Sequence, residues 1–193
     1  MVGVTADFAA VVLAGGRARR LGGVDKVLLP VGGRSLLQRT LDVLRGAVPL
    51  VVVGPQREVD APVHWTGEEP PGGGPLAGVR AGLQLVPEGS ALVAVLAADH
   101  PHLTEATVPR LRAAVLAAPR AGGAVLVDAA GERQWLLGVW RADRLRAAMP
   151  EQVRDRPVRG TFAALDPVEV APVGAEPADV DTPEDLLRAR NRA

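Results

Sequence analysis

Apolar runs and segments with helical spacing alternate through the first half of the chain. Residues 8–13, 49–54 and 91–99 are almost entirely apolar and have the length of strands, which indicates strands buried on both faces. Residues 34–44 and 76–86 lie between these runs and carry apolar side chains on one helical face. This alternation predicts an α/β fold in which helices connect the strands of a mostly parallel sheet.

The pattern changes in the second half, where two short strands follow each other closely. Residues 124–129 and 134–140 are predicted to form an antiparallel pair joined by a turn around Gly131. Trp135 and Trp140 are five positions apart in this region, so strand geometry predicts that they point to opposite faces of the sheet. Core packing is the expected role of both, and for one of them the alternative is stacking on a bound ring or covering a partner interface.

Further elements complete the predicted secondary structure. They are a helix over 104–118, short helices over 141–149 and 157–165, a strand over 167–173 and a terminal helix that opens at 181–187. Thr104 is the expected N-cap of the first of these helices, and Pro109 is expected to delay its start or bend it. Asp181 or Thr182 is expected to cap the terminal helix, with Pro183 at its first position.

Composition narrows the classes of protein to which the chain can belong. The 193 residues contain no internal repeat and no long linker, so residues 1–193 are predicted to form a single domain. The formal net charge is zero, which argues against a basic surface for nucleic acid, and the lack of cysteine excludes disulfides and thiolate zinc sites. No basic segment precedes the first apolar run, and no apolar run is long enough to span a bilayer. We therefore expect a cytoplasmic protein that binds neither nucleic acid nor membranes.

A glycine-rich stretch, LAGGRARRLGGVDK at residues 13–26, follows the first predicted strand. Ligands of open α/β sheets bind where strands end and helices begin, and Gly15 and Gly16 allow backbone N–H groups to approach an anion closely. The spacing fits neither the Rossmann fingerprint nor the P-loop. Positive charge is supplied by four residues, namely Arg17, Arg19, Arg20 and Lys26. The stretch therefore predicts a phosphate-binding loop of another type, with a solvated basic turn as the alternative.

Lys26 is the only lysine among the 22 basic residues of the chain. A lysine ammonium is a compact charge on a flexible stem, whereas a guanidinium is a planar fork suited to fixed contacts. A group that has to follow negative charge as it shifts between phosphates is better served by lysine. Random placement would put the lysine in this stretch about one time in five, so its position supports the phosphate loop without establishing it.

Acidic residues at the end of the third predicted strand and near the C-terminus are candidate metal ligands. Asp99 directly follows an apolar strand, and a carboxylate there suits Mg²⁺, which binds one or two carboxylates, several waters and phosphate oxygens. Capping of the turn that follows is an equally good explanation for Asp99. Asp179 and Asp181 form a second acidic pair, which also suits the N-terminus of a helix. His100 and His102 are weak zinc candidates, because no third ligand accompanies them.

Four blocks of the sequence, taken together, resemble the molybdenum cofactor guanylyltransferases, which belong to a broad superfamily of nucleotidyltransferases. The blocks occur in the family's order and are LAGGRARRLGGVDK at 13–26, GPLAG at 74–78, AADHP at 97–101 and DVDTPEDL at 179–186. The first two are highly specific in combination. The resemblance implies one nucleotide-binding domain with three α/β/α layers, Rossmann-like and built on a mostly parallel central sheet.

The resemblance also implies an activity, which is transfer of GMP from GTP to molybdopterin carrying molybdenum (Mo-molybdopterin), forming the guanine dinucleotide cofactor and pyrophosphate. It implies Mg²⁺ as the cofactor, held by Asp99 and Asp181, and Lys26, Arg20 and Asp99 as catalytic residues. The N-terminal half would bind the nucleotide and the C-terminal half the pterin. The implied nucleotide-binding residues are Leu13, Ala14, Gly15, Gly16, Lys26, Gly54, Glu69, Gly74, Pro75, Leu76 and Asp99. Proteins of molybdenum cofactor insertion and molybdoenzyme maturation are the implied partners.

The chain departs from the family's pattern near some of these residues. Asp181 stands where an asparagine is frequent, and Gly54 stands where the family tends to have a polar residue. The family also tends to have an acidic residue ahead of GPLAG. Glu68 and Glu69 are the nearest acids in this chain, and Glu69 is taken for that position.

The expected mechanism is in-line nucleotidyl transfer. The terminal phosphate of molybdopterin attacks the α-phosphorus of GTP and needs no general base, so catalysis consists mainly of positioning and charge stabilisation. Related enzymes use CTP or other phosphorylated acceptors, and LAGG together with GPLAG favours GTP. An alternative from another class is a non-catalytic nucleotide-binding domain, which the presence of both Lys26 and Asp99 disfavours.

Overall fold

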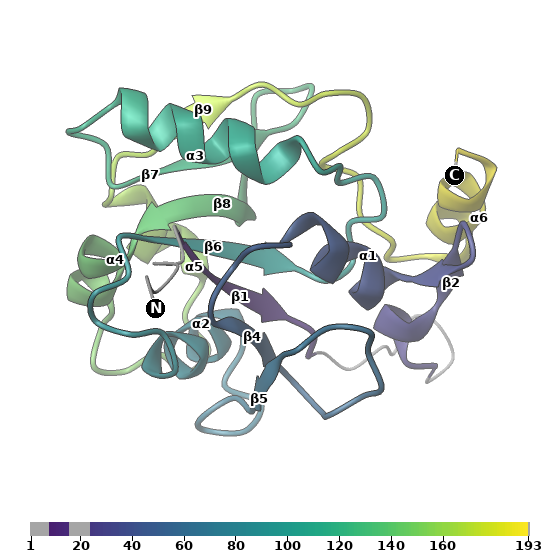
Figure 1. The fold of residues 1–193 in the computed structure, drawn as a ribbon, viewed down its shortest axis with the longest axis horizontal. Helices are drawn as coiled ribbons and strands as arrows, with labels where there is room; N and C mark the ends of the chain where they lie inside the picture. Colours follow the sequence, from purple (N-terminus) through teal and green to yellow (C-terminus); the bar gives the residue numbers. More distant parts are fainter. Residues whose placement is uncertain (1–7, 16–23, 193) are drawn as a thin grey trace, which may run out of the picture.

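The computed structural model describes residues 8–15 and 24–192 and is built around a seven-stranded sheet (Figure 1). The strand order is β5-β4-β1-β6-β8-β7-β9. In chain order these strands are β1 (Ala9–Leu13), β4 (Leu50–Val53), β5 (His64–Thr66), β6 (Leu92–Ala97), β7 (Gly123–Val127), β8 (Arg133–Arg141) and β9 (Val168–Val170). β8 runs antiparallel to both of its neighbours, and the other pairings of this sheet are parallel. The predicted α/β fold with a mostly parallel sheet is therefore confirmed.

Helices cover both faces of the sheet and give the three predicted layers. One face packs against α1 (Leu36–Val43) and α3 (Thr107–Ala117), and the other against α2 (Pro75–Gln84), α4 (Ala142–Ala148) and α5 (Val158–Ala163) (Figure 1). Successive strand residues point to opposite faces, so the fully apolar β1 contributes side chains to both cores. None of the helices in the described ranges is long and apolar enough to cross a membrane.

The last helix lies apart from these layers, next to the segment that follows the glycine-rich stretch. α6 (Pro183–Asn191) packs on a small hairpin of β2 (Pro30–Val31) and β3 (Arg34–Ser35), with η2 (Lys26–Leu28) just ahead of it (Figure 1). A third apolar cluster joins them and contains Val31, Leu36, Val180 and Ala189. Thr182, one of the two caps expected from the sequence, is the N-cap of α6, and it forms a capping box with Asp185. The C-terminal segment is thereby held beside residues near position 30.

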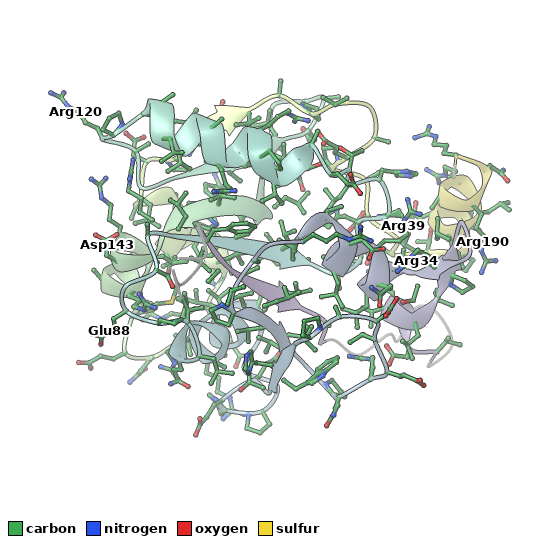
Figure 2. All side chains as sticks on the ribbon, in the orientation of Figure 1. Arg34, Arg39, Glu88, Arg120, Asp143 and Arg190 are labelled. Carbon is green, nitrogen blue, oxygen red and sulfur yellow. The ribbon has the colours of Figure 1, made fainter. Side chains whose placement is uncertain are left out.

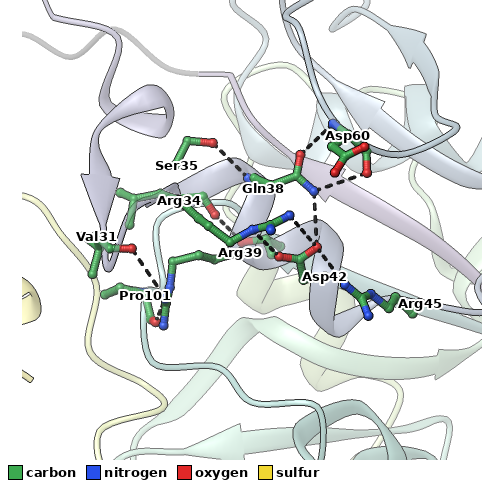
Figure 3. Close-up of polar contacts among 11 residues, drawn as sticks. Val31, Arg34, Ser35, Gln38, Arg39, Asp42, Arg45, Asp60 and Pro101 are labelled. Carbon is green, nitrogen blue, oxygen red and sulfur yellow. Dashed lines mark hydrogen bonds and ion pairs between the residues drawn. The ribbon is translucent and has the colours of Figure 1, made fainter. Parts of the chain in front are cut away.

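A polar network fastens α1 to the segments around it (Figure 3). Gln38 exchanges hydrogen bonds with the backbone of Asp60, and its amide nitrogen also donates to Asp42 Oδ1 at 3.2 Å. Arg39 donates to the carbonyl oxygens of Pro101 and Val31 at 3.0 and 3.3 Å. The loop after β6 and the hairpin after η2 are therefore tied to the same helix.

Three predicted details were wrong or incomplete. α3 begins at Thr107 with Ala106 as its N-cap, so Thr104 does not cap it, but the delayed start expected from Pro109 is confirmed. Pro109 lies in the first turn, where no backbone N–H is needed. β5 was not predicted, because it is a short edge strand without an apolar run. Trp135 and Trp140 pack against the same core, because the pairing of β7 with β8 is irregular between them and breaks the two-residue alternation.

Candidate functional site

Three parallel strands end side by side, and the residues after them remain hydrogen-bonded across the sheet. The amide of Ala14, after β1, donates to the carbonyl of Val53 at 2.9 Å. The amide of Ala98, after β6, donates to the carbonyl of Leu13 at 3.0 Å. The loops that follow β1, β4 and β6 therefore begin at one edge of the sheet, which is the edge where ligands of open α/β sheets bind.

The loop after β4 touches the loop after β1 through a glycine. Gly54 has φ +148°, a backbone conformation that side chains disfavour. A Cβ at this position would lie 2.9 Å from the carbonyl carbon and oxygen of Ala14 and 3.1 Å from the amide nitrogen of Gly15. Two segments that were predicted separately to bind the nucleotide thus lie backbone against backbone.

The GPLAG turn lies against the same edge through Glu68. Gly74 is the N-cap of α2, and its amide donates to Glu68 Oε2 at 3.3 Å. Glu68 Oε1 lies 3.4 Å from the position that a Cβ on Gly15 would take. Glu69 is exposed, and its backbone carbonyl accepts a hydrogen bond from Arg80. The acid that contacts both predicted nucleotide-binding turns is therefore Glu68, whereas the sequence prediction had assigned Glu69.

Lys26 lies between two carboxylates that come from distant parts of the chain. Its Nζ is 2.8 Å from Asp99 Oδ2, at the end of β6, and 2.6 Å from Asp181 Oδ1, just before α6. Burial alone would lower the pKa of Lys26, but the two carboxylates outweigh burial and raise it, so the ammonium is fully charged at neutral pH. The structure thus brings together three residues that were predicted to carry phosphate and metal binding.

Asp179 adds a third carboxylate to this group. Carboxylate oxygens of Asp99, Asp179 and Asp181 lie within 4.8 Å of one another. Val180, between the two later aspartates, is buried in the third apolar cluster, and its amide donates to the carbonyl of Asp99 at 3.1 Å. Burial raises the pKa of Asp179, and the negative charge of Asp181 raises it further. Asp179 belongs to the acidic pair recognised in the sequence, but the family resemblance implied only Asp99 and Asp181 as the metal ligands.

The donor set of this acidic group fits a hard divalent cation. Its ligands are carboxylate oxygens, which Mg²⁺ prefers, and three carboxylates face a single lysine. Asp99 Oδ1 is buried and has no hydrogen-bond partner among the described residues, although His100 Nε2 lies 3.5 Å away. A buried oxygen of this kind is one that a cation would satisfy. The role of these residues as metal ligands remains a prediction.

A second ion pair fixes the backbone next to Lys26. Arg57, in the loop after β4, donates to both carboxylate oxygens of Asp25, at 2.6 and 3.0 Å, and to the carbonyl of Pro55 at 3.0 Å. Bidentate pairing of this type gives a defined geometry. Nothing in the sequence pattern pointed to this pair, because its members are 32 residues apart.

Two predicted site residues, Gly16 and Arg20, lie outside the described residues.

Comparison with known proteins gives consistent matches. Residues 10–168 match the model of a family described as the MobA-like NTP transferase domain. A molybdenum cofactor guanylyltransferase of Rhodopseudomonas palustris (strain HaA2) is 34% identical over 205 residues, which cover 95% of this chain and 91% of the relative. A protein of the same name from Mesorhizobium japonicum is 31% identical, and the alignment covers 95% of this chain and 94% of that relative.

Solved structures agree with the fold. Molybdopterin-guanine dinucleotide biosynthesis protein A from Archaeoglobus fulgidus superposes with a TM-score of 0.68 at 20% identity, covering 96% of this chain and 98% of that chain. The 2-C-methyl-D-erythritol 4-phosphate cytidylyltransferase of Thermus thermophilus superposes with a TM-score of 0.71 at 21% identity and the same coverage. At these identities the likeness concerns the fold alone.

Proposed function

The chain belongs to the family of MobA-like NTP transferase domains, and from this premise we propose that it transfers GMP from GTP to Mo-molybdopterin. The products are molybdopterin guanine dinucleotide and pyrophosphate. The curated relatives named molybdenum cofactor guanylyltransferase, which match over nearly the whole chain, support this activity. The observation that carries the proposal is the meeting of Lys26, Asp99 and Asp181 at the strand ends beside the turn of Ala14 and Gly15.

In the proposed reaction an oxygen of the acceptor's terminal phosphate bonds to the α-phosphorus of GTP, and the bond from that phosphorus to pyrophosphate breaks. Lys26 supplies a positive charge for the phosphates, and the amides of the glycine-rich turn approach them. Asp99 and Asp181 would hold Mg²⁺, which when bound neutralises negative charge that develops on the phosphate oxygens. Arg20 is proposed as a further positive charge beside the phosphates.

The nucleotide is proposed to lie across the ends of β1 and β4. Gly54, Glu68 and the turn at Gly74 bring backbone groups and one carboxylate together there, which suits polar recognition of a base. We propose that this edge receives the guanosine. Residues 1–193 would form one domain, with the N-terminal half binding the nucleotide and the C-terminal half the pterin.

The setting of the reaction is proposed on chemical grounds. The product is a cofactor that other proteins use, so proteins of molybdenum cofactor insertion and molybdoenzyme maturation are the proposed recipients. We place the reaction in the cytoplasm, which agrees with a chain that lacks cysteine.

The choice of nucleotide is tested by thermal unfolding with GTP, CTP, ATP or UTP, each with Mg²⁺. A ligand that binds only the folded state raises the midpoint, and we expect GTP alone to do so. Incubation of GTP and Mo-molybdopterin with the protein should then yield the dinucleotide and pyrophosphate, measured by chromatography. A shift with CTP alone would assign the chain to cytidylyl transfer, and no dinucleotide from any nucleotide would contradict the proposal.

Gly54→Ala should weaken GTP binding by roughly fivefold to a hundredfold. The new Cβ would meet the backbone of Ala14 and displace the turn that is proposed to bind GTP. Restoring the binding position of this turn would cost about 1–3 kcal/mol, where 1.4 kcal/mol corresponds to a factor of ten in affinity. Isothermal titration with GTP and Mg²⁺ measures the change. Gly131→Ala is the matched control, because Gly131 also has a positive φ, +82°, but has open space around it in the turn between β7 and β8. Equal GTP affinities of the two variants would contradict the expectation.

A further inference from the structure

In this structure Lys26 contacts two of the residues that are proposed to hold a divalent cation. The ammonium contacts Asp99 and Asp181 at 2.8 and 2.6 Å, and these residues with Asp179 form the acidic group. Ligand oxygens on opposite sides of one Mg²⁺ or Ca²⁺ are about 4–5 Å apart. The oxygens of the acidic group lie within 4.8 Å of one another, so the space between them fits one cation. In the described structure the Lys26 ammonium pairs with two of these three carboxylates.

The backbone of Lys26 is held, so its side chain is the part that can move. Asp25 is fixed by the bidentate pair with Arg57, and the η2 turn hydrogen-bonds the carbonyl of Lys26 to the amide of Leu29 at 3.1 Å. Val27 is buried in the core beneath. A lysine side chain turns readily about its four-carbon stem. The ammonium can therefore leave the carboxylates without displacement of the chain around it.

We propose that Lys26 occupies the cation position of the acidic group until a divalent cation binds there, and that this binding releases the ammonium toward the nucleotide phosphates. The release is expected because two positive groups that share the same carboxylates repel each other. Asp99 Oδ1, buried and without a hydrogen bond in the described part of the chain, is an acceptor that the arriving cation would satisfy. The destination of the ammonium rests on the proposed function, whereas the exchange itself does not. Cation occupancy and nucleotide capture are thereby coupled through one side chain.

Competition for the carboxylates is tested by titrating Mn²⁺ into nucleotide-free protein and measuring the heat of binding. Lys26→Met keeps an unbranched side chain one heavy atom shorter and removes its charge, and we expect it to bind Mn²⁺ about tenfold more tightly than the wild type. Lys26→Arg keeps the positive charge and serves as the control, with an affinity within about threefold of the wild type. Equal or weaker binding by Lys26→Met would overturn the proposal.

The single lysine of the chain provides a direct measurement of its own release. Protein labelled with ¹⁵N-lysine gives one side-chain ammonium signal. We expect this signal to change as Mg²⁺ is added, in proportion to the occupancy found by calorimetry. Acylation of Lys26, followed by mass spectrometry with the amine at the start of the chain as internal reference, should become several-fold faster with Mg²⁺. A lysine signal and an acylation rate that stay unchanged at saturating Mg²⁺ would show that the ammonium is not released, and would overturn the exchange.

The outcomes separate this inference from the proposed function. Both measurements are made without nucleotide, so a chain that did not transfer GMP would still show the exchange if it occurs. Conversely, a chain that forms the dinucleotide but shows no exchange would retain the proposed activity and lose this inference.

A third variant, Asp179→Asn, is expected to weaken Mn²⁺ binding about tenfold. An unchanged affinity would remove Asp179 from the acidic group's cation site.

Discussion

Lys26→Ala should lower the rate of GMP transfer by about a hundred- to a thousand-fold, as removal of one preorganised charge or donor does in comparable sites. The reason is that Lys26 is the positive side chain that the described structure places at the strand ends, 2.8 Å from Asp99. The measurement is a single-turnover assay with GTP, Mg²⁺ and Mo-molybdopterin. Thermal midpoints with Mg²⁺ should differ little, because the cation compensates the carboxylates once the ammonium is gone.

The control for this variant is Arg120→Ala. Arg120 is an exposed basic residue at the end of the molecule opposite the labelled Arg34, Arg39 and Arg190 (Figure 2). Its removal changes the net charge of the protein by the same amount and should leave transfer within about twofold, since exposed distant charges are screened. A Lys26→Ala variant that transfers GMP within about threefold of the wild-type rate would contradict the role given to Lys26.

Glu176→Ala should destabilise the fold by about 3–5 kcal/mol, the range found when one partner of a buried ion pair is removed. Glu176 is completely buried and accepts hydrogen bonds from Thr107, from both terminal nitrogens of Arg110 and from the amide of Val173. These contacts fasten the segment before the acidic group to α3. The side chain of Arg110 is 28% exposed, so water can reach part of the charge left behind and the lower end of the range is expected.

Guanidinium unfolding measures this loss, with Glu169→Ala as the matched control. Glu169 also pairs with an arginine, Arg133, at 2.8 Å, but its side chain is 50% exposed. Exposed pairs contribute about 0–1 kcal/mol, so the control should change stability little. Similar effects of the two variants would contradict the importance given to burial at Glu176.

The pH dependence of stability follows from the same residue. Burial alone would raise the pKa of Glu176, but its hydrogen bonds from Arg110, Thr107 and Val173 outweigh burial and hold the pKa below its usual value. The native state therefore binds fewer protons than the unfolded state, whose glutamate pKa is about 4.3. The contribution is fully present above that pH and is lost as the pH falls through the lower native pKa. Glu176→Gln should remove this part of the acid sensitivity.

The elements that the sequence predicted are those with a strong periodic signal. β1, β4 and β6 are uninterrupted apolar runs, α1 and α2 carry apolar side chains at helical spacing, and α6 opens with a helix-start signal, so local pattern was sufficient. The N-cap of α3 was misplaced because Thr104 resembles a cap, whereas the delayed start expected from Pro109 is confirmed. The faces of the two tryptophans depended on an irregular strand pairing, which no alternation pattern reveals.

The site was predicted to the extent that strand ends and family motifs marked it. Lys26, Asp99 and Asp181 were named from such signals, and the structure places them in contact. Glu68 and Glu69 are neighbours in an irregular loop, where no helix or strand periodicity indicates which of the two side chains faces the site. The pairs of Arg57 with Asp25 and of Glu176 with Arg110 join residues 32 and 66 positions apart, and tertiary packing alone creates them.

The contact between Lys26 and Asp181 also sets the order in which the site can be assembled during synthesis. The two residues are 155 positions apart. The strands of the main sheet lie between residues 9 and 170, so they are synthesised before Asp179 and Asp181. Loop closure over such a distance is slow relative to local folding. A nascent chain can thus have all the strands of its sheet and still lack two of its three acidic side chains. A cation that needs all three carboxylates could therefore bind only after residues 179–181 have been synthesised.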